Sequence, residues 1–172
     1  MEPNYISNNV YEKIKDFECD NLTDEQEWLI DELTLNKELK KRYKKRGLCK
    51  GCKQSSAVWC QSCNSERFQQ NFQNWTSGNS DVDKLIQESQ LNAKNYCEQL
   101  EWIEYDRFED IEYITKGGFG KVYRANWKDG RIEGWNYETN QWQRDFNELV
   151  ALKCLNNSKD MALEFLNEVI LQ

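Results

Sequence analysis

The hydrophobic pattern of the chain changes near residue 108. Upstream of it, apolar residues recur every three or four positions, as they do on one face of a helix. This spacing predicts a long helix over residues 23–46, a second helix beginning at Ser65 and a third beginning at Asp81. Downstream, apolar and polar residues alternate as they do along a half-buried strand. The chain is therefore expected to have an α+β fold, in which a helical leader precedes antiparallel strands.

The predicted helix over residues 23–46 has recognisable ends. Thr23 and Gln26 match a capping box, and Gly47 follows the last turn. The basic run at residues 40–46 can be a solvated helix end, a nucleic-acid patch or a nuclear address. A net charge of −7 and a pI near 4.8 disfavour binding to a phosphate backbone. We therefore expect a solvated helix end and no nucleic-acid partner.

Two cysteine pairs follow this helix. Cys49 and Cys52 enclose two residues, seven residues follow, and Cys60 and Cys63 enclose two more. Paired Cys-x-x-Cys turns are the usual way to build a tetrahedral four-thiolate zinc site. Because four thiolates leave no position open for water, the spacing predicts a small structural zinc knuckle over residues 47–64, and a protein partner could bind it.

Neighbouring residues suggest how the knuckle is shaped. Gly51 is expected to permit the tight first turn, and Val58 and Trp59 suggest a small hairpin with Trp59 over the metal. Disulfides or unliganded buried thiols are the alternatives. The first residues lack a basic end and an apolar core, so no signal peptide is predicted. A reducing, cytoplasmic compartment suits zinc-bound thiolates, and a nuclear location stays open.

A glycine-rich turn between two predicted strands is the second motif. The residues Ile114-Thr-Lys-Gly-Gly-Phe-Gly-Lys-Val-Tyr-Arg-Ala125 are followed at a distance by Val150-Ala-Leu-Lys-Cys154. Glycine allows the backbone to approach a phosphate closely, since it has no Cβ. Phe119 at the tip could cover the phosphates, and Lys153 could reach them from a mostly apolar strand.

These two segments resemble the N-terminal lobe of eukaryotic protein kinases over residues 108–172. The resemblance is to the tyrosine-kinase-like type, including expanded fungal families. It implies that Lys153 holds the ATP phosphates and that Glu168, in a following helix, pairs with Lys153. Thr115 replaces the usual first glycine. By resemblance, the ATP-contacting residues are Ile114, Gly117, Gly118, Phe119, Gly120, Val122, Ala151 and Lys153.

The resemblance implies a protein kinase, which transfers the γ-phosphoryl group of ATP to a hydroxyl of a protein substrate with Mg²⁺. The chain contains no histidine and no Asp-Phe-Gly sequence, so neither the catalytic base nor the Mg²⁺ ligands of the family are in it. We expect these 172 residues alone to be inactive. The alternative is a non-catalytic adaptor, with a zinc knuckle and a vestigial kinase lobe.

An insertion at residues 128–148 separates the two kinase-like segments. Ile132, Trp135, Tyr137 and Trp142 flank a polar turn, which predicts a hairpin that extends the neighbouring strands. Its tryptophans are expected to pack the hairpin on itself, and a partner-binding face is the alternative.

The predicted organisation has four parts: a helical leader over 1–46, the knuckle over 47–64, a helical linker region over 65–107 and the partial kinase domain over 108–172. Trp102, Tyr105 and Phe108 are expected to dock the linker onto the lobe. No apolar stretch approaches the roughly 20 residues that a membrane span needs.

Overall fold

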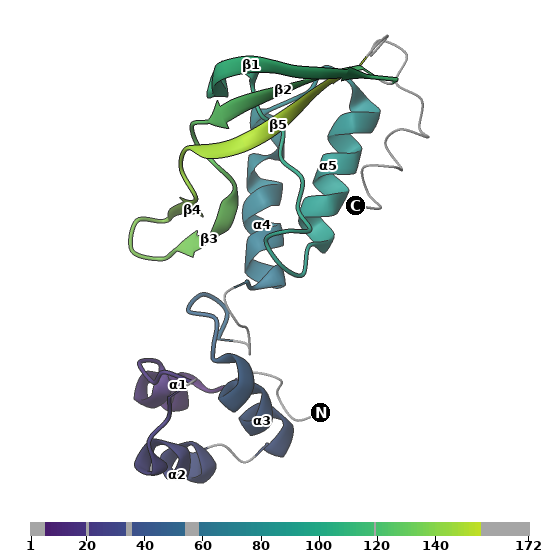
Figure 1. Cartoon of the computed structure of the whole chain (residues 1–172). Helices are drawn as coiled ribbons and strands as arrows, with labels where there is room; N and C mark the ends of the chain where they lie inside the picture. Colours follow the sequence, from purple (N-terminus) through teal and green to yellow (C-terminus); the bar gives the residue numbers. More distant parts are fainter. Residues whose placement is uncertain (1–5, 20, 34–35, 54–58, 119, 156–172) are drawn as a thin grey trace.

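The computed structural model describes residues 6–19, 21–33, 36–53, 59–118 and 120–155. Within these residues the protein is mixed α+β with antiparallel sheets, as predicted. The helices are α1 (Asn8–Ile14), α2 (Asp24–Leu33), α3 (Lys37–Arg46), α4 (Gln61–Asn71) and α5 (Ser80–Asn92), with short 3₁₀ turns η1 (Phe72–Asn74) and η2 (Tyr105–Arg107). The strands are β1 (Phe108–Gly117), β2 (Gly120–Trp127), β3 (Ile132–Asn136), β4 (Gln141–Arg144) and β5 (Glu148–Leu155) (Figure 1).

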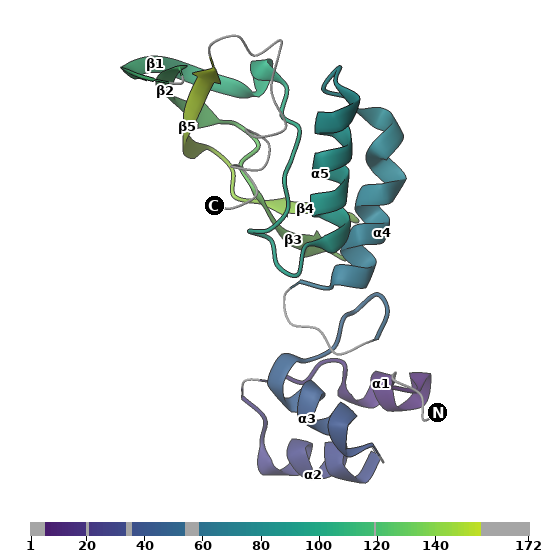
Figure 2. The same ribbon diagram turned by 90° about the vertical axis from the view of Figure 1, so that its right-hand side faces the viewer.

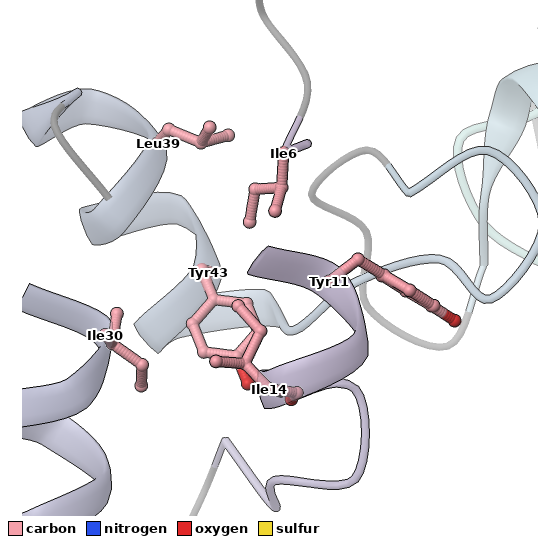
Figure 3. Close-up of a cluster of buried hydrophobic side chains, with 6 residues drawn as sticks. All are labelled: Ile6, Tyr11, Ile14, Ile30, Leu39 and Tyr43. Atoms are coloured by element: carbon pink, nitrogen blue, oxygen red, sulfur yellow. Dashed lines mark hydrogen bonds between the residues drawn. The ribbon is translucent and has the colours of Figure 1, made fainter. Parts of the chain in front are cut away.

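Helices α1, α2 and α3 enclose a small apolar core of their own. Figure 3 shows the buried side chains of this cluster: Ile6, Ile14, Ile30, Leu39 and Tyr43 gather between the helices, whereas the Tyr11 ring points away from them, toward the side where Lys53 Nζ lies 4.7 Å from its centroid. The hydroxyl of Tyr43 donates a hydrogen bond to the carbonyl oxygen of Ile14 at 2.7 Å. This bond satisfies the polar end of a ring that is only 2% exposed.

The prediction of one helix over residues 23–46 is wrong, because the structure has α2 and α3 as separate helices. The capping box is confirmed, since Thr23 Oγ1 accepts from Gln26 N and Gln26 Oε1 accepts from Thr23 N. The second helix has its own cap, where the Asn36 side chain accepts from Leu39 N at 3.0 Å. A continuous helix would extend about 36 Å, whereas the break lets α3 fold back beside α2.

The basic run on α3 faces acidic residues of α2. Lys44 pairs with Glu27 and Asp31 at 3.2 and 3.4 Å, and the ammonium of Lys40 donates to the carbonyl oxygen of Asp31 at 2.6 Å. Part of the positive charge is therefore used within the helical leader. The basic run lies in the last turns of α3, as expected of a helix end, and the prediction about nucleic acid stays a prediction.

The strands form two separate antiparallel sheets. One has three strands in the order β1-β2-β5, and the other is the two-stranded hairpin of β3 and β4. The sheet of β1, β2 and β5 lies toward one end of the α4–α5 pair, and α1–α3 lie beyond the other end (Figures 1 and 2). The predicted hairpin is confirmed, but it does not extend the neighbouring strands.

The hairpin packs on α4 rather than on itself alone. Trp142 of β4 stacks on Phe68 of α4 with ring centroids 4.4 Å apart, and on Trp59 at 6.2 Å. Ile132 of β3 is 2% exposed in the same cluster, beside Ala93. The hairpin thus supplies part of the core that α4 and α5 share.

Polar contacts join the linker to the strands. Glu101 pairs with Arg144 at 2.5 Å and accepts a hydrogen bond from Ile132 N at 3.3 Å. In contrast, Trp102 and Tyr105 are 38% and 71% exposed, so the predicted docking of the linker is wrong for these two residues, while Phe108 is the half-buried first residue of β1. The indole N–H of Trp102 donates to Glu104 at the surface, whereas the two charges of the Glu101–Arg144 pair neutralise each other where they are largely buried.

Gly130 gives the first testable prediction. It lies where the hairpin leaves β2, with a φ of +61°, and a Cβ there would meet the carbonyl oxygen of Asp145 at 1.5 Å. We expect Gly130→Ala to lower the free energy of unfolding by more than about 3 kcal/mol, the upper end of ordinary point mutations. Urea unfolding of the metal-loaded chain measures this loss.

Gly78 is the matched control, because its φ is also positive at +81° but no atom lies within 4 Å of the position that a Cβ would take. Gly78→Ala meets only the left-handed backbone penalty, about 1–2 kcal/mol. Equal losses for the two substitutions would show that the close approach to Asp145 does not exist.

Candidate functional site: a four-cysteine cluster and a glycine-turn sheet

The two cysteine pairs are held in different kinds of backbone. Cys49 and Cys52 lie in a turn closed by a hydrogen bond from Lys53 N to Cys49 O at 2.9 Å. Cys60 is the N-cap residue of α4, and Cys63 lies in the first turn of this helix. The helix therefore begins at Gln61, and the prediction of a start at Ser65 is wrong. The hydroxyl of Ser65 instead donates to Ser62 O inside the helix.

All four sulfurs lie within 4.8 Å of one another. Cys49 Sγ is 3.6 Å from Cys63 Sγ, and Cys52 Sγ is 3.5 Å from Cys60 Sγ. Four sulfurs about 2.3 Å from a tetrahedral zinc ion would be about 3.8 Å apart, so the observed spacing fits this metal. A disulfide needs about 2.05 Å, and all four cysteines are free. The cluster can hold a metal ion such as zinc.

Without a metal, the thiols of Cys49, Cys60 and Cys63 do not ionise together. The pKa of Cys49 falls to about 4, chiefly because Cys60 donates a hydrogen bond to its sulfur, with Tyr137 and the backbone N–H groups of Cys52 and Gly51 as further donors. The same hydrogen bond to Cys49, together with burial, raises the pKa of Cys60. Burial raises the pKa of Cys63 to about 12. Zinc must therefore displace protons from Cys60 and Cys63 when it binds.

Gly51 is needed for space and not for an unusual backbone. Its φ lies outside the left-handed region, but a Cβ there would be 3.1 Å from Cys63 Sγ and 3.3 Å from Tyr137 Cε1. The prediction gave the wrong reason for this glycine: it is needed because Cys63 and Tyr137 lie close to it, and not because the turn is tight. Tyr137 follows β3 and donates its hydroxyl to Cys49 Sγ at 3.0 Å. No local sequence signal indicated this contact.

Trp59 was predicted to lie over the metal, and the structure shows its packing instead. Its indole N–H donates to the carbonyl oxygen of Ala93 at 3.0 Å, and its ring lies against Phe68. Trp59 therefore belongs to the core between α4 and α5, directly before the N-cap residue Cys60. Val58 and the predicted small hairpin lie outside the described residues.

The glycine turn joins β1 to β2. Gly117 pairs with Gly120 at the end of these strands. Gly117 and Gly118 are exposed. Phe119 lies outside the described residues, as does Glu168, so the expected pairing of Glu168 with Lys153 is neither supported nor opposed.

Strand register brings three of the predicted nucleotide residues to one sheet face. Lys153 of β5 is opposite Val122 of β2, and Ala151 is opposite Arg124. Because partners share a face and side chains alternate, Val122, Ala151 and Lys153 lie on the same side of the sheet. The buried residues Ala125 and Trp127 lie on the other side.

Ile114 lies at an irregularity of β1. The register with β2 shifts between Tyr113 and Thr115, and Ile114 is 55% exposed. A bulge of this kind turns side chains away from the regular alternation. The alternation of apolar and polar residues did not indicate this shift.

No protein-family model, curated protein or solved structure matches the chain. Function is therefore inferred from the residues and their geometry. Among the described residues, no helix is both long enough and apolar enough to cross a bilayer.

The cysteine cluster gives the second testable prediction. The purified chain should bind one zinc ion, with an affinity that falls as the pH falls. Because zinc must displace at least the protons of Cys60 and Cys63, we expect the affinity to drop by at least about a hundredfold per pH unit. The sign follows from zinc lowering the thiol pKa values, so the stability that zinc adds is present at high pH and lost on acidification. Competition with a chromophoric chelator at pH 6, 7 and 8 measures this slope.

Cys49→Ser should lose zinc binding, whereas Cys97→Ser is the control because Cys97 is exposed and outside the cluster. Full zinc content in Cys49→Ser, or a loss of zinc in Cys97→Ser, would contradict the assignment of the four ligands.

Proposed function

We propose that the chain carries the nucleotide-binding part of a protein kinase, which transfers the γ-phosphoryl group of ATP to protein hydroxyls. One observation carries this proposal: Val122, Ala151 and Lys153 share a sheet face beside a glycine turn. The order β1-β2-β5 and the antiparallel pairing agree with it. A glycine turn alone would be weak support.

The register supports a role for Lys153 at the phosphates. Val122, its partner on β2, is two residues from Gly120 at the end of the turn. Two residues along a strand span about 7 Å, which a lysine side chain can bridge. Phosphates lying under the exposed backbone of Gly117 and Gly118 would therefore be within reach of its ammonium group.

Each group has a different role in binding ATP. Val122 and Ala151 offer a small apolar surface on which an adenine ring can lie. The N–H groups of the glycine turn can donate to phosphate oxygens, because no side chains shield them. Lys153 adds a positive charge that favours the triphosphate. These residues bind and orient ATP, while the base and the Mg²⁺ ligands would come from groups that this sequence does not contain.

Zinc would have a structural role in this proposal. Cys49, Cys52, Cys60 and Cys63 supply four thiolates, which fill a tetrahedral site and leave no position for substrate. The cluster lies between the core of α1–α3 and the core of α4 and α5 (Figure 1). Each of these cores is small, so a bound metal would supply stability that they lack.

The second candidate is a non-catalytic adaptor. It is favoured by a cavity of about 390 Å³ beside the cysteines, lined in part by Leu48, Trp135 and Tyr137. An apolar side chain of a protein partner could enter it. In this case Lys153→Met would leave binding unchanged, while Cys49→Ser would remove it.

The third testable prediction separates the two. An acyl-phosphate derivative of ATP transfers its acyl group to lysines close to bound phosphates. We expect it to label Lys153, and excess ATP with Mg²⁺ to suppress this labelling. Lys121 is the matched control, because it lies on β2 opposite Cys154, on the other face of the same sheet. Peptide mass spectrometry quantifies both sites.

Equal labelling of Lys153 and Lys121, with no protection by ATP, would count against the kinase proposal and favour the adaptor. The zinc measurements are independent of this result, because the labelling experiment does not involve the cysteines.

A further inference from the structure

Tyr137 brings the hairpin to the cysteine cluster. It is 88 residues from Cys49 in sequence, yet its hydroxyl oxygen is 3.0 Å from Cys49 Sγ. A thiolate can only accept hydrogen bonds, so the phenol must be the donor once the sulfur is ionised or bound to a metal. The contact thus joins two segments that are far apart in the sequence.

Arg67 holds the ring of Tyr137 in place. Its guanidinium carbon is 4.2 Å from the centroid of Trp135 and 5.1 Å from that of Tyr137. Its Nη1 also donates to Asn64 Oδ1 at 2.8 Å, and Asn64 is 2% exposed on α4. A tyrosine ring that stacks on a guanidinium, itself held by a hydrogen bond, loses little further freedom when the tyrosine hydroxyl binds sulfur.

Gly51 is a second, independent sign of the same contact. A Cβ at this position would be 3.3 Å from Tyr137 Cε1 and 3.4 Å from its hydroxyl oxygen. Its backbone has no positive φ that would require glycine. Gly51, which directly precedes Cys52, therefore leaves room for the ring of Tyr137.

We propose that Tyr137 is a positioning residue of the metal centre, whose hydroxyl donates to the metal-bound sulfur of Cys49 and fixes the hairpin of β3 and β4 to it. This inference rests on the zinc centre and not on the kinase activity. A donor to a ligating sulfur draws charge from it and fixes its orientation. Loss of such outer partners typically lowers metal affinity by about 10–100-fold.

The proposal extends the metal site to the insertion between β2 and β5. The hairpin follows β2 and precedes β5, so both ends of it enter the sheet that carries Val122 and Lys153. A metal that fixes the turn of the hairpin therefore also restrains the connection between β2 and β5. When the metal is bound, the cysteine cluster, the hairpin and the three-stranded sheet then move as one unit.

Tyr137→Phe is the direct test, because it keeps the ring that Arg67 contacts and removes the hydroxyl. We expect zinc affinity, measured by chelator competition, to fall about tenfold. In the cobalt-loaded chain, the sulfur-to-cobalt charge-transfer band should move to longer wavelength, since the sulfur loses a donor. Tyr105→Phe is the control, because Tyr105 is 71% exposed and does not line the cavity beside the four cysteines.

The outcomes separate the proposed role of Tyr137 from the existence of the four-cysteine metal site. Wild-type affinity and an unchanged cobalt spectrum in Tyr137→Phe would overturn the role of Tyr137 and leave the four ligands standing. If the wild-type chain binds no zinc, the metal centre and this inference both fail. A spectrum that shifts equally in Tyr105→Phe would also overturn the inference.

A measurement on the wild-type chain covers the case in which Tyr137→Phe does not fold. Hydrogen exchange is compared with and without zinc. We expect zinc to slow exchange at the amides of β3 and β4 as well as in the cysteine turns. Protection confined to residues 49–52 and 60–63 would overturn the proposed link to the hairpin.

Discussion

The stacking of Trp142 on Phe68 is the contact on which the arrangement of this protein depends. Trp142 belongs to an insertion between two strands, and Phe68 to a helix that begins at a cysteine ligand. The stack buries the face of the hairpin against α4, and Trp59 extends it on the side next to Cys60. Apolar burial is the main favourable term available here, since each aromatic side chain removes about 150–250 Å² from water. Without this stack, polar contacts would be the main link between the strands and the helices.

Those polar contacts are weaker anchors. The pair of Arg107 and Asp129 is partly exposed on both sides, and pairs of this kind contribute about 0–1 kcal/mol. The Glu101–Arg144 pair is more deeply buried, so its attraction is offset by the loss of hydration of both charges. The Glu101–Arg144 pair joins the linker to β4 of the hairpin. The hairpin is held on the helices mainly by the aromatic stack, and its turn also contacts the cysteine cluster through Tyr137.

Signals that act within a few residues were predictable from the sequence. The spacing of the cysteines, the capping box at Thr23 and the polar turn of the hairpin all act locally, and the structure contains each of them. The break before α3 was missed, although Asn36 three residues before Leu39 is a cap signal that could have been found. The docking of Trp142 and the approach of Tyr137 to Cys49 could not be found in this way. Both depend on how distant segments meet, which no short pattern in a single sequence encodes.

The two candidate sites make different demands on the same strands. A nucleotide site needs an exposed sheet face and a glycine turn without side chains over it. Strands β1 and β5 accordingly bury little apolar surface, since Tyr113, Ile114 and Leu149 are more than half exposed. A sheet of three strands with so little covered surface has limited stability by itself. The hairpin compensates, because it adds Ile132 and Trp142 to the core of α4 and α5, beyond the burial of Ala125 and Trp127 in the sheet itself. The insertion therefore accounts for how a sheet with an exposed face can be held on a small helical module, and the hydrogen bond between Tyr137 and Cys49 joins the turn of the hairpin to the cysteine cluster.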